Sequence, residues 1–171
     1  ANFKKRRMNW NVRLMEHCCN YMAISSNSIE NKFMQHIKEI IIIGSSGYAK
    51  VIIDIVEKEN KYNIIGLLDK FRNGGDTLGY KILGKEENIA DLTAKHNLFG
   101  GIIAIGDNWT RKKVYEKIKL IAPKFTFVRT IHPDAQIARD VQIGNGTIIM
   151  AGVVINTNST VGDHCILNTN S

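Results

Sequence analysis

The chain has 171 residues, of which 44% are hydrophobic, and it carries a formal net charge of +7. This length and composition suit one ordinary folded domain with a small second one, and they exclude a largely disordered chain. Residues 1–33 hold a net charge of +4, so the positive excess is concentrated at the start of the chain. Because no basic stripe with interleaved aromatic residues follows, the sequence indicates no nucleic-acid partner. No apolar run approaches the length of about 18 residues that a transmembrane segment needs.

Residues 1–33 form a basic leader that we predict to be poorly ordered. Its charges cluster in Lys4–Arg7 without an amphipathic partner stretch, which is typical of a solvated segment; contact with a membrane surface is the alternative. The leader also lacks the continuous apolar core of a signal peptide. Cys18, Cys19 and Cys165 have neither the spacing of a zinc site nor a plausible disulfide arrangement, so we expect no metal and a reducing, cytoplasmic setting.

Residues 34–129 alternate between short apolar runs and segments of helical periodicity. The run at 39–44 is long enough for a strand buried on both faces, and 48–58 places Val51, Ile52, Ile55 and Val56 at helical spacing. Further strands are expected at 64–69, 80–84 and 101–106, and further helices at 86–96 and 110–121. Such alternation predicts an α/β domain with a parallel, Rossmann-like sheet, whose ligands bind at the carboxyl ends of the strands.

Three of these strand ends carry residues suited to a phosphate or a sugar. The first is Gly44-Ser45-Ser46-Gly47 before a helix, where backbone N–H groups can receive phosphate; a tight turn with a serine cap is the alternative. The second is Asp69, placed for a ribose hydroxyl or simply exposed at a strand end. The third is the segment 106–111, from Gly106 to Arg111, where Asp107 or Asn108 could instead cap the next helix.

An aliphatic residue returns at every sixth position from Ile131 to Leu167, and a small or branched residue follows it four positions later. This period fits neither a helix nor a strand, and it predicts a parallel β-helix in which three hexads make one coil. Residues 130–171 therefore form a second domain. Because the 41 residues from 131 to 171 give little more than two coils and a solenoid needs about three repeats with a polar cap, we expect the repeat to continue beyond Ser171. His164 is expected at an exposed corner of a coil, beside Asp163, without a catalytic role.

Taken in order, the loop 44–47, the strand ending in Asp69, and the segments LGYKILGKEENI, IAIGDNWTRKKV and IHPDAQI before the hexads resemble a known family. They are similar to sugar O-/N-acyltransferases of the sialic-acid O-acetyltransferase and bacillosamine-pathway acetyltransferase type, within the hexapeptide-repeat superfamily. The resemblance covers residues 40–171. It implies a left-handed β-helix that assembles homotrimers and holds acetyl-CoA, and a Rossmann-like domain that binds a nucleotide-linked sugar, usually a UDP-sugar.

Carried over to this chain, the resemblance assigns sugar-nucleotide binding to seven residues: Gly44, Ser45, Ser46, Gly47, Tyr48, Asp69 and Gly106. Tyr48 stands where family members often have histidine. The family's catalytic base is a histidine in a hydrophobic-x-His-acid element, which is expected just beyond Ser171, so no catalytic residue is assigned within the chain. The expected activity is acetyl transfer to an amino or hydroxyl group of the sugar, in surface glycan biosynthesis.

Two other functions stay open. The chain could be a non-catalytic subunit that binds UDP-sugars and trimerises through its β-helix, in which case it would not cleave a thioester. A Rossmann-type oxidoreductase is the second alternative, and the absence of a G-x-G-x-x-G sequence disfavours it.

Overall fold

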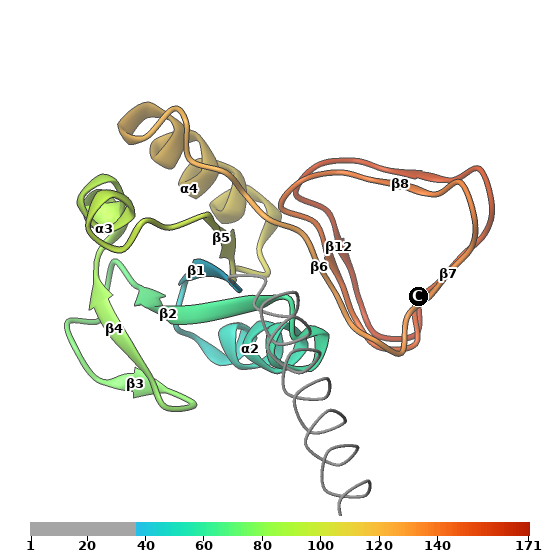
Figure 1. The fold of residues 1–171 in the computed structure, drawn as a ribbon, viewed down its shortest axis with the longest axis horizontal. Coiled ribbons are helices and arrows are strands. Elements are labelled where there is room, and N and C mark those ends of the chain that lie inside the picture. Colours follow the sequence, from blue (N-terminus) through green and yellow to red (C-terminus); the bar gives the residue numbers. More distant parts are fainter. Residues whose placement is uncertain (1–36) are drawn as a thin grey trace, which may run out of the picture. The chain divides into compact units, whose positions relative to one another are not determined.

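A computed structural model describes residues 37–171, and the predicted leader 1–33 lies outside the described residues. Two units follow one another within 38–171: an α/β part with a five-stranded sheet, and a coil of short parallel strands (Figure 1). The predicted fold class, a parallel α/β sheet followed by the start of a hexapeptide β-helix, is confirmed. The domain limits 34–129 and 130–171 stay a prediction. None of the helices within 37–171 is long and apolar enough to cross a lipid bilayer.

The sheet has the strand order β3-β4-β2-β1-β5. All neighbouring strands are parallel except β3 and β4, which form an antiparallel hairpin. Strands β1 and β2 lie inside the sheet, while β5 and β3 form its two edges. The elements of the α/β part are β1 (Lys38–Ile43), α2 (Gly47–Glu59), β2 (Tyr62–Leu68), β3 (Asp76–Thr77), β4 (Tyr80–Gly84), the 3-10 helix η1 (Glu86–Asn88), α3 (Ile89–His96), β5 (Gly100–Ile103) and α4 (Asn108–Ile121).

Strand β1 is buried on both faces, as its continuous apolar run predicts. Successive side chains of a strand point to opposite faces, so Ile40 and Ile42 pack with α2 while Ile41 and Ile43 pack under α3 and α4. Each of these four side chains is 0% exposed, and full burial of one contributes about 1.5–3 kcal/mol. The helices accordingly lie on opposite sides of the sheet, with α2 on one and α3 and α4 on the other (Figure 1).

Helix α2 buries a different stripe from the predicted one. Val51 was expected to face the core but is 41% exposed, whereas Ile53 is fully buried. The buried stripe starts two residues before Val51, at Ala49, and continues through Ile52, Ile53 and Val56 at the spacing i, i+3, i+4, i+7. The other predicted residues, Ile52, Ile55 and Val56, are buried as expected.

The hexads form a β-helix in the predicted register. Each strand pairs with the one 18 residues later, as Ile131 does with Ile149 and Ile149 with Leu167. The aliphatic residues of the repeat point inward and form one core cluster around Ile149, Val153 and Ile155. The strands are β6 (Thr130–Ile131), β7 (Gln136–Ile137), β8 (Gln142–Ile143), β9 (Ile148–Ile149), β10 (Val154–Ile155), β11 (Thr160–Val161) and β12 (Ile166–Leu167).

One side of the β-helix packs against the α/β part. Ile148 in β9 and Met150 directly after this strand belong to the same core cluster as the buried residues of α2. The Glu59 carboxylate at the end of α2 accepts hydrogen bonds from Thr130 Oγ1 at 2.7 Å and from the Ile131 N–H at 3.3 Å. The first strand of the β-helix is therefore fixed to the end of α2.

We expect the substitution Ile149→Ala to lower the free energy of unfolding by about 2–5 kcal/mol, because it leaves a cavity in the β-helix core. Val154→Ala is the matched control: Val154 lies in the next strand but is 62% exposed, so its loss should change stability by less than about 0.5 kcal/mol. Urea unfolding followed by circular dichroism measures both. Equal effects of the two substitutions would contradict the inward placement of Ile149.

Candidate functional site

The loop 44–47, called the β1 loop below, passes between the ends of two neighbouring strands. Gly44 donates its N–H to the Leu68 carbonyl at the end of β2, at 2.7 Å. On the other side, a Cβ added to Gly44 would lie 2.9 Å from the Ala104 carbonyl oxygen, and the φ of Gly44 is +109°. Only glycine fits this close approach, so the loop holds its position by backbone packing.

The Asp69 carboxylate fastens the β1 loop to the end of β2. Its Oδ2 accepts the Ser45 N–H at 3.1 Å and the Ser45 hydroxyl at 2.6 Å. Its Oδ1 accepts the N–H groups of Phe71 at 2.8 Å and Arg72 at 3.1 Å. Partial burial by itself would raise the pKa of Asp69, but these hydrogen bonds, the one from the Ser45 hydroxyl first among them, outweigh it and hold the pKa below its ordinary value.

Arg72 and Thr77 bring the β3–β4 hairpin onto the same loop. The Arg72 guanidinium donates to the Ser45 carbonyl and hydroxyl, both at 3.2 Å, and to Thr77 Oγ1 at 3.4 Å. The Thr77 hydroxyl, which is buried, donates to the Ser45 carbonyl at 3.1 Å. Ser45 is therefore held from three sides by side chains that follow β2 or belong to β3.

These contacts leave a pocket of about 460 Å³ at the start of α2. This volume lies in the range of small-molecule sites, about 300–1,000 Å³. Neither Ser45 nor Ser46 caps α2 with its hydroxyl, so the alternative interpretation of this loop, a turn with a capping serine, is wrong. The first N–H groups of a helix have no hydrogen-bond partner within the helix. The lining residues are Ser45, Ser46, Gly47, Lys50, Arg72, Asp76, Thr77 and Leu78.

The seven residues predicted to bind the sugar nucleotide do not all meet at this pocket. Three of them, Ser45, Ser46 and Gly47, line it. Gly44 and Asp69 do not line it but connect the loop to the end of β2 by hydrogen bonds. The other two lie together elsewhere, because the Tyr48 ring packs against Gly106, 3.6 Å from where a Cβ of this glycine would be. Their part in binding stays a prediction, as it does for the other five.

Sequence reasoning missed five lining residues: Lys50, Arg72, Asp76, Thr77 and Leu78. Lys50 lies in the first turn of α2, one turn after the glycine that opens the helix, and this spacing is a signal that could have been used. The other four belong to the glycine-rich segment after β2, which folds back onto the β1 loop. Their place depends on hydrogen bonds between segments about 30 residues apart, which no local pattern encodes.

The third strand end serves mainly to join the two units. Asp107 caps α4 by accepting the Thr110 N–H at 2.7 Å, as the alternative interpretation had it. Arg111 is buried and donates to the carbonyls of Ile105 and Gly106, both at 3.0 Å, and to the His164 carbonyl at 3.2 Å. The buried guanidinium therefore connects the end of β5 to a corner of the β-helix.

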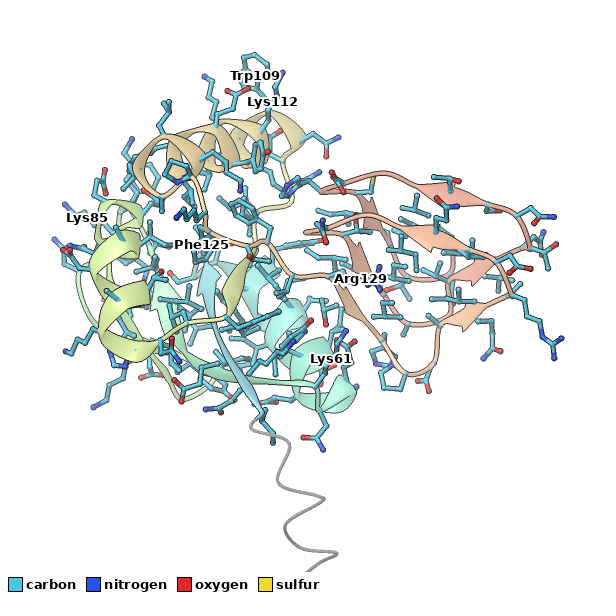
Figure 2. All side chains as sticks on the ribbon, turned by 45° about the horizontal axis from the view of Figure 1, so that its top comes forward. Lys61, Lys85, Trp109, Lys112, Phe125 and Arg129 are labelled. Carbon is cyan, nitrogen blue, oxygen red and sulfur yellow. The ribbon has the colours of Figure 1, made fainter. Side chains whose placement is uncertain are left out.

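Trp109 projects outward from the start of α4 together with Lys112 (Figure 2) and is 62% exposed.

The environment of Tyr48 combines an apolar ring packing with an unmatched hydroxyl. Its hydroxyl oxygen is buried and has no hydrogen-bond partner among the described residues. Burial raises the pKa of Tyr48, and the nearby Arg111 charge opposes this rise only in part. Tyr48 therefore stays protonated at neutral pH, and its hydroxyl keeps a hydrogen to donate.

His164 lies at a corner of the β-helix but is half-buried, where an exposed position was predicted. Its ring packs on Tyr115 and Phe127, with ring centroids 4.4 Å and 5.0 Å away, so α4 and the following segment cover it. Burial lowers the pKa of His164; the Asp163 carboxylate opposes this effect, and the Arg111 and Lys119 charges add to it. The ring is a packing element in its neutral form.

Comparison with known proteins agrees with this architecture. Residues 39–118 match the PglD N-terminal domain, and residues 140–171 match the bacterial transferase hexapeptide (six repeats). The chain therefore combines a PglD N-terminal domain with hexapeptide repeats, and it is homologous to proteins named as sugar N-acetyltransferases. The family resemblance deduced from the motifs is therefore confirmed.

Several proteins named as acetyltransferases are similar to this chain over most of its length. UDP-N-acetylbacillosamine N-acetyltransferase of Bacillus subtilis is 32% identical over 117 residues, which are 67% of this chain and 52% of that protein. PerB from Caulobacter crescentus, solved in complex with CoA and GDP-perosamine, is 33% identical with a TM-score of 0.69, over 78% of this chain and 61% of that one. The acetyltransferase domain of PglB from Neisseria gonorrhoeae, solved with acetyl coenzyme A, is 25% identical with a TM-score of 0.67, over 78% and 62%. The chain spans about half to three-fifths of the length of these relatives.

We expect Asp69→Asn to lower the free energy of unfolding by about 2 kcal/mol, because an amide cannot accept all four hydrogen bonds and its NH2 group faces the Ser45 N–H donor. Asp54→Asn is the control, since Asp54 forms only an exposed pair with Lys58 and its loss should change stability by less than about 0.5 kcal/mol. Urea unfolding at neutral pH measures both. An Asp69→Asn variant as stable as the wild type would show that the loop does not depend on this carboxylate.

The lowered pKa of His164 predicts a loss of stability in mild acid. As pH falls through the ordinary histidine pKa of about 6.5, the unfolded chain takes up a proton that the folded chain does not yet bind. Below the folded-state pKa both states bind this proton, so the free energy of unfolding falls no further through His164. His164→Asn, which tolerates the positive φ of 54° at this position, removes the effect. The difference in unfolding free energy between wild type and variant should therefore change between about pH 7.5 and pH 5; a constant difference would refute the prediction.

Proposed function

We propose that this chain is the nucleotide-sugar-binding part of an acetyl-CoA-dependent acetyltransferase that acylates an amino group on the sugar, in glycan biosynthesis. The observation that carries the proposal is the polar pocket at the β1 loop, which lies within the segment matching the PglD N-terminal domain. An amino group is favoured over a hydroxyl because relatives of the chain are named N-acetyltransferases.

The charges of the pocket suit a diphosphate. Lys50 and Arg72 supply two positive charges against the single carboxylate of Asp76 among the lining residues. The positive end of the α2 dipole adds to them, since Ser46 and Gly47 at the start of this helix line the same pocket. Asp69 contributes by holding Ser45, and its oxygens are already used by four donors. The nucleotide could be UDP, which the resemblance implies, or GDP, since PerB was solved with a GDP-sugar.

In the proposed reaction, the sugar amine attacks the thioester carbonyl of acetyl-CoA, an amide bond forms, and the CoA thiol leaves. A base takes the proton that the amine loses. His164 is not assigned this role, because its ring packs on Tyr115 and Phe127 and its carbonyl is held by Arg111. We further propose that the protein is cytoplasmic and assembles as a homotrimer through the β-helix. Light scattering of the purified protein would test the trimer by its molar mass.

Binding measurements test the proposal directly. Isothermal titration calorimetry with a UDP- and a GDP-linked 4-amino sugar should show saturable binding of at least one of them. Lys50→Met should weaken it about tenfold by removing a phosphate contact. Lys58→Met is the control, because Lys58 lies at the other end of α2 in an exposed pair with Asp54.

Release of CoA from acetyl-CoA, followed with a thiol reagent, separates the two functions that the sequence leaves open. Sugar-dependent release by the protein that contains this chain supports the acetyltransferase. Binding of the nucleotide sugar without any release would favour a non-catalytic subunit. The absence of binding to both nucleotide sugars would refute the proposed function.

A further inference from the structure

The turn that joins β3 and β4 has an unusual residue at its first position. Because Thr77 pairs with Tyr80, only Leu78 and Gly79 form the connection. Their φ values are +51° and +83°, and a two-residue hairpin turn with both values positive is of type I′. Such turns favour asparagine, aspartate or glycine at the first position, whereas a leucine there brings its Cβ close to a backbone oxygen.

Burial does not compensate for this conformation, because Leu78 is 54% exposed. Its apolar side chain thus gains little from the folded state. The other non-glycine residues with positive φ within residues 37–171 are all polar and of types that tolerate this region better: Asn60, Asn97, Asp140, Asn158, His164 and Asn170. Leu78 therefore has a backbone conformation that leucine disfavours and an apolar side chain that is exposed. Such departures from local preference are expected where a side chain serves binding.

Leu78 is also the one hydrocarbon side chain in the lining of the β1-loop pocket, whose other lining residues are polar, charged or glycine. The turn beneath it is anchored, because Arg72 donates to the Asp76 carbonyl at 3.4 Å and the Asp76 carboxylate accepts the Gly79 N–H at 3.3 Å. Leu78 is thus held at the rim with its side chain open to solvent.

We propose that Leu78 is the apolar wall on which the nucleoside of the bound nucleotide sugar packs. This inference rests on the proposed function and assigns the two ends of the ligand to two parts of the pocket. The diphosphate needs positive charge and N–H donors, which lie at Lys50 and the start of α2. The base has an apolar face that gains from covering a hydrocarbon side chain, and Leu78 supplies it.

The test compares stability with affinity for two probes, UDP or GDP and inorganic pyrophosphate. Leu78→Asn suits the type I′ turn and removes the wall, so the Tm should stay equal or rise. Affinity for the nucleoside diphosphate should fall about fivefold or more, while affinity for pyrophosphate stays unchanged. Leu78→Met, which keeps an apolar surface, should retain most of the affinity.

Leu120→Asn provides the matched control, since Leu120 is 84% exposed on α4 and outside the pocket, and it should change neither affinity. If wild-type protein binds the nucleoside diphosphate and Leu78→Asn binds it equally well, the inference is wrong while the proposed function stands. A variant that loses stability together with both affinities would show that Leu78 serves only the fold, and would also overturn it. If the wild type binds neither UDP nor GDP, the proposed function itself fails.

Discussion

The arrangement of the pocket depends on one carboxylate. Asp69 follows the last residue of β2, and its two oxygens accept hydrogen bonds from Ser45 on one side and from Phe71 and Arg72 on the other. The β1 loop and the segment leading to β3 are thereby fixed to the same strand end. A charged acceptor with several N–H and O–H donors forms stronger hydrogen bonds than a neutral one. The position of Arg72, and through it that of the β3–β4 hairpin, follows from this contact.

A second charged group joins the α/β part to the β-helix. The Arg111 guanidinium reaches the Gly106 carbonyl at the end of β5 and the His164 carbonyl at a corner of the coil. A buried guanidinium is tolerated because each of its nitrogens donates to an oxygen, including Asn108 Oδ1. At the other end of the contact, Glu59 fixes β6 to α2. Polar contacts at two points and the apolar contact through Ile148 between them hold the units together.

Much of the fold could be predicted from the sequence, because it depends on periodicity. A six-residue repeat requires three hexads per coil, and Ile131 pairs with Ile149 as this predicts. The apolar run at 39–44 predicted a strand buried on both faces, and the structure has β1 there. The stripe of α2 was predicted less well, since Val51 and Ile53 are equally apolar and only the direction of the helix relative to the sheet distinguishes them.

The details of the site could be predicted only in part. The β1 loop and Asp69 were found because they directly follow strands, and the carboxyl ends of parallel strands meet at one edge of the sheet. What Asp69 does there could not be predicted, because its partners are chosen by the tertiary structure. The same holds for Tyr48, whose neighbour Gly106 lies after β5 and more than 50 residues later in the chain, and for His164, which is covered by the helix α4.

The use of Asp69 as an internal contact also has an electrostatic consequence for an anionic ligand. A free carboxylate about 6 Å from a phosphate would repel it by about 3 kcal/mol at an effective dielectric constant of about 20. In this pocket both oxygens of Asp69 face donors of the chain itself, so its charge is compensated by four oriented N–H and O–H dipoles. Lys50 and Arg72 then determine the sign of the potential at the start of α2. The Asp69 carboxylate can therefore hold the β1 loop in place while repelling an anion in the pocket less than a carboxylate with unpaired oxygens at the same position would.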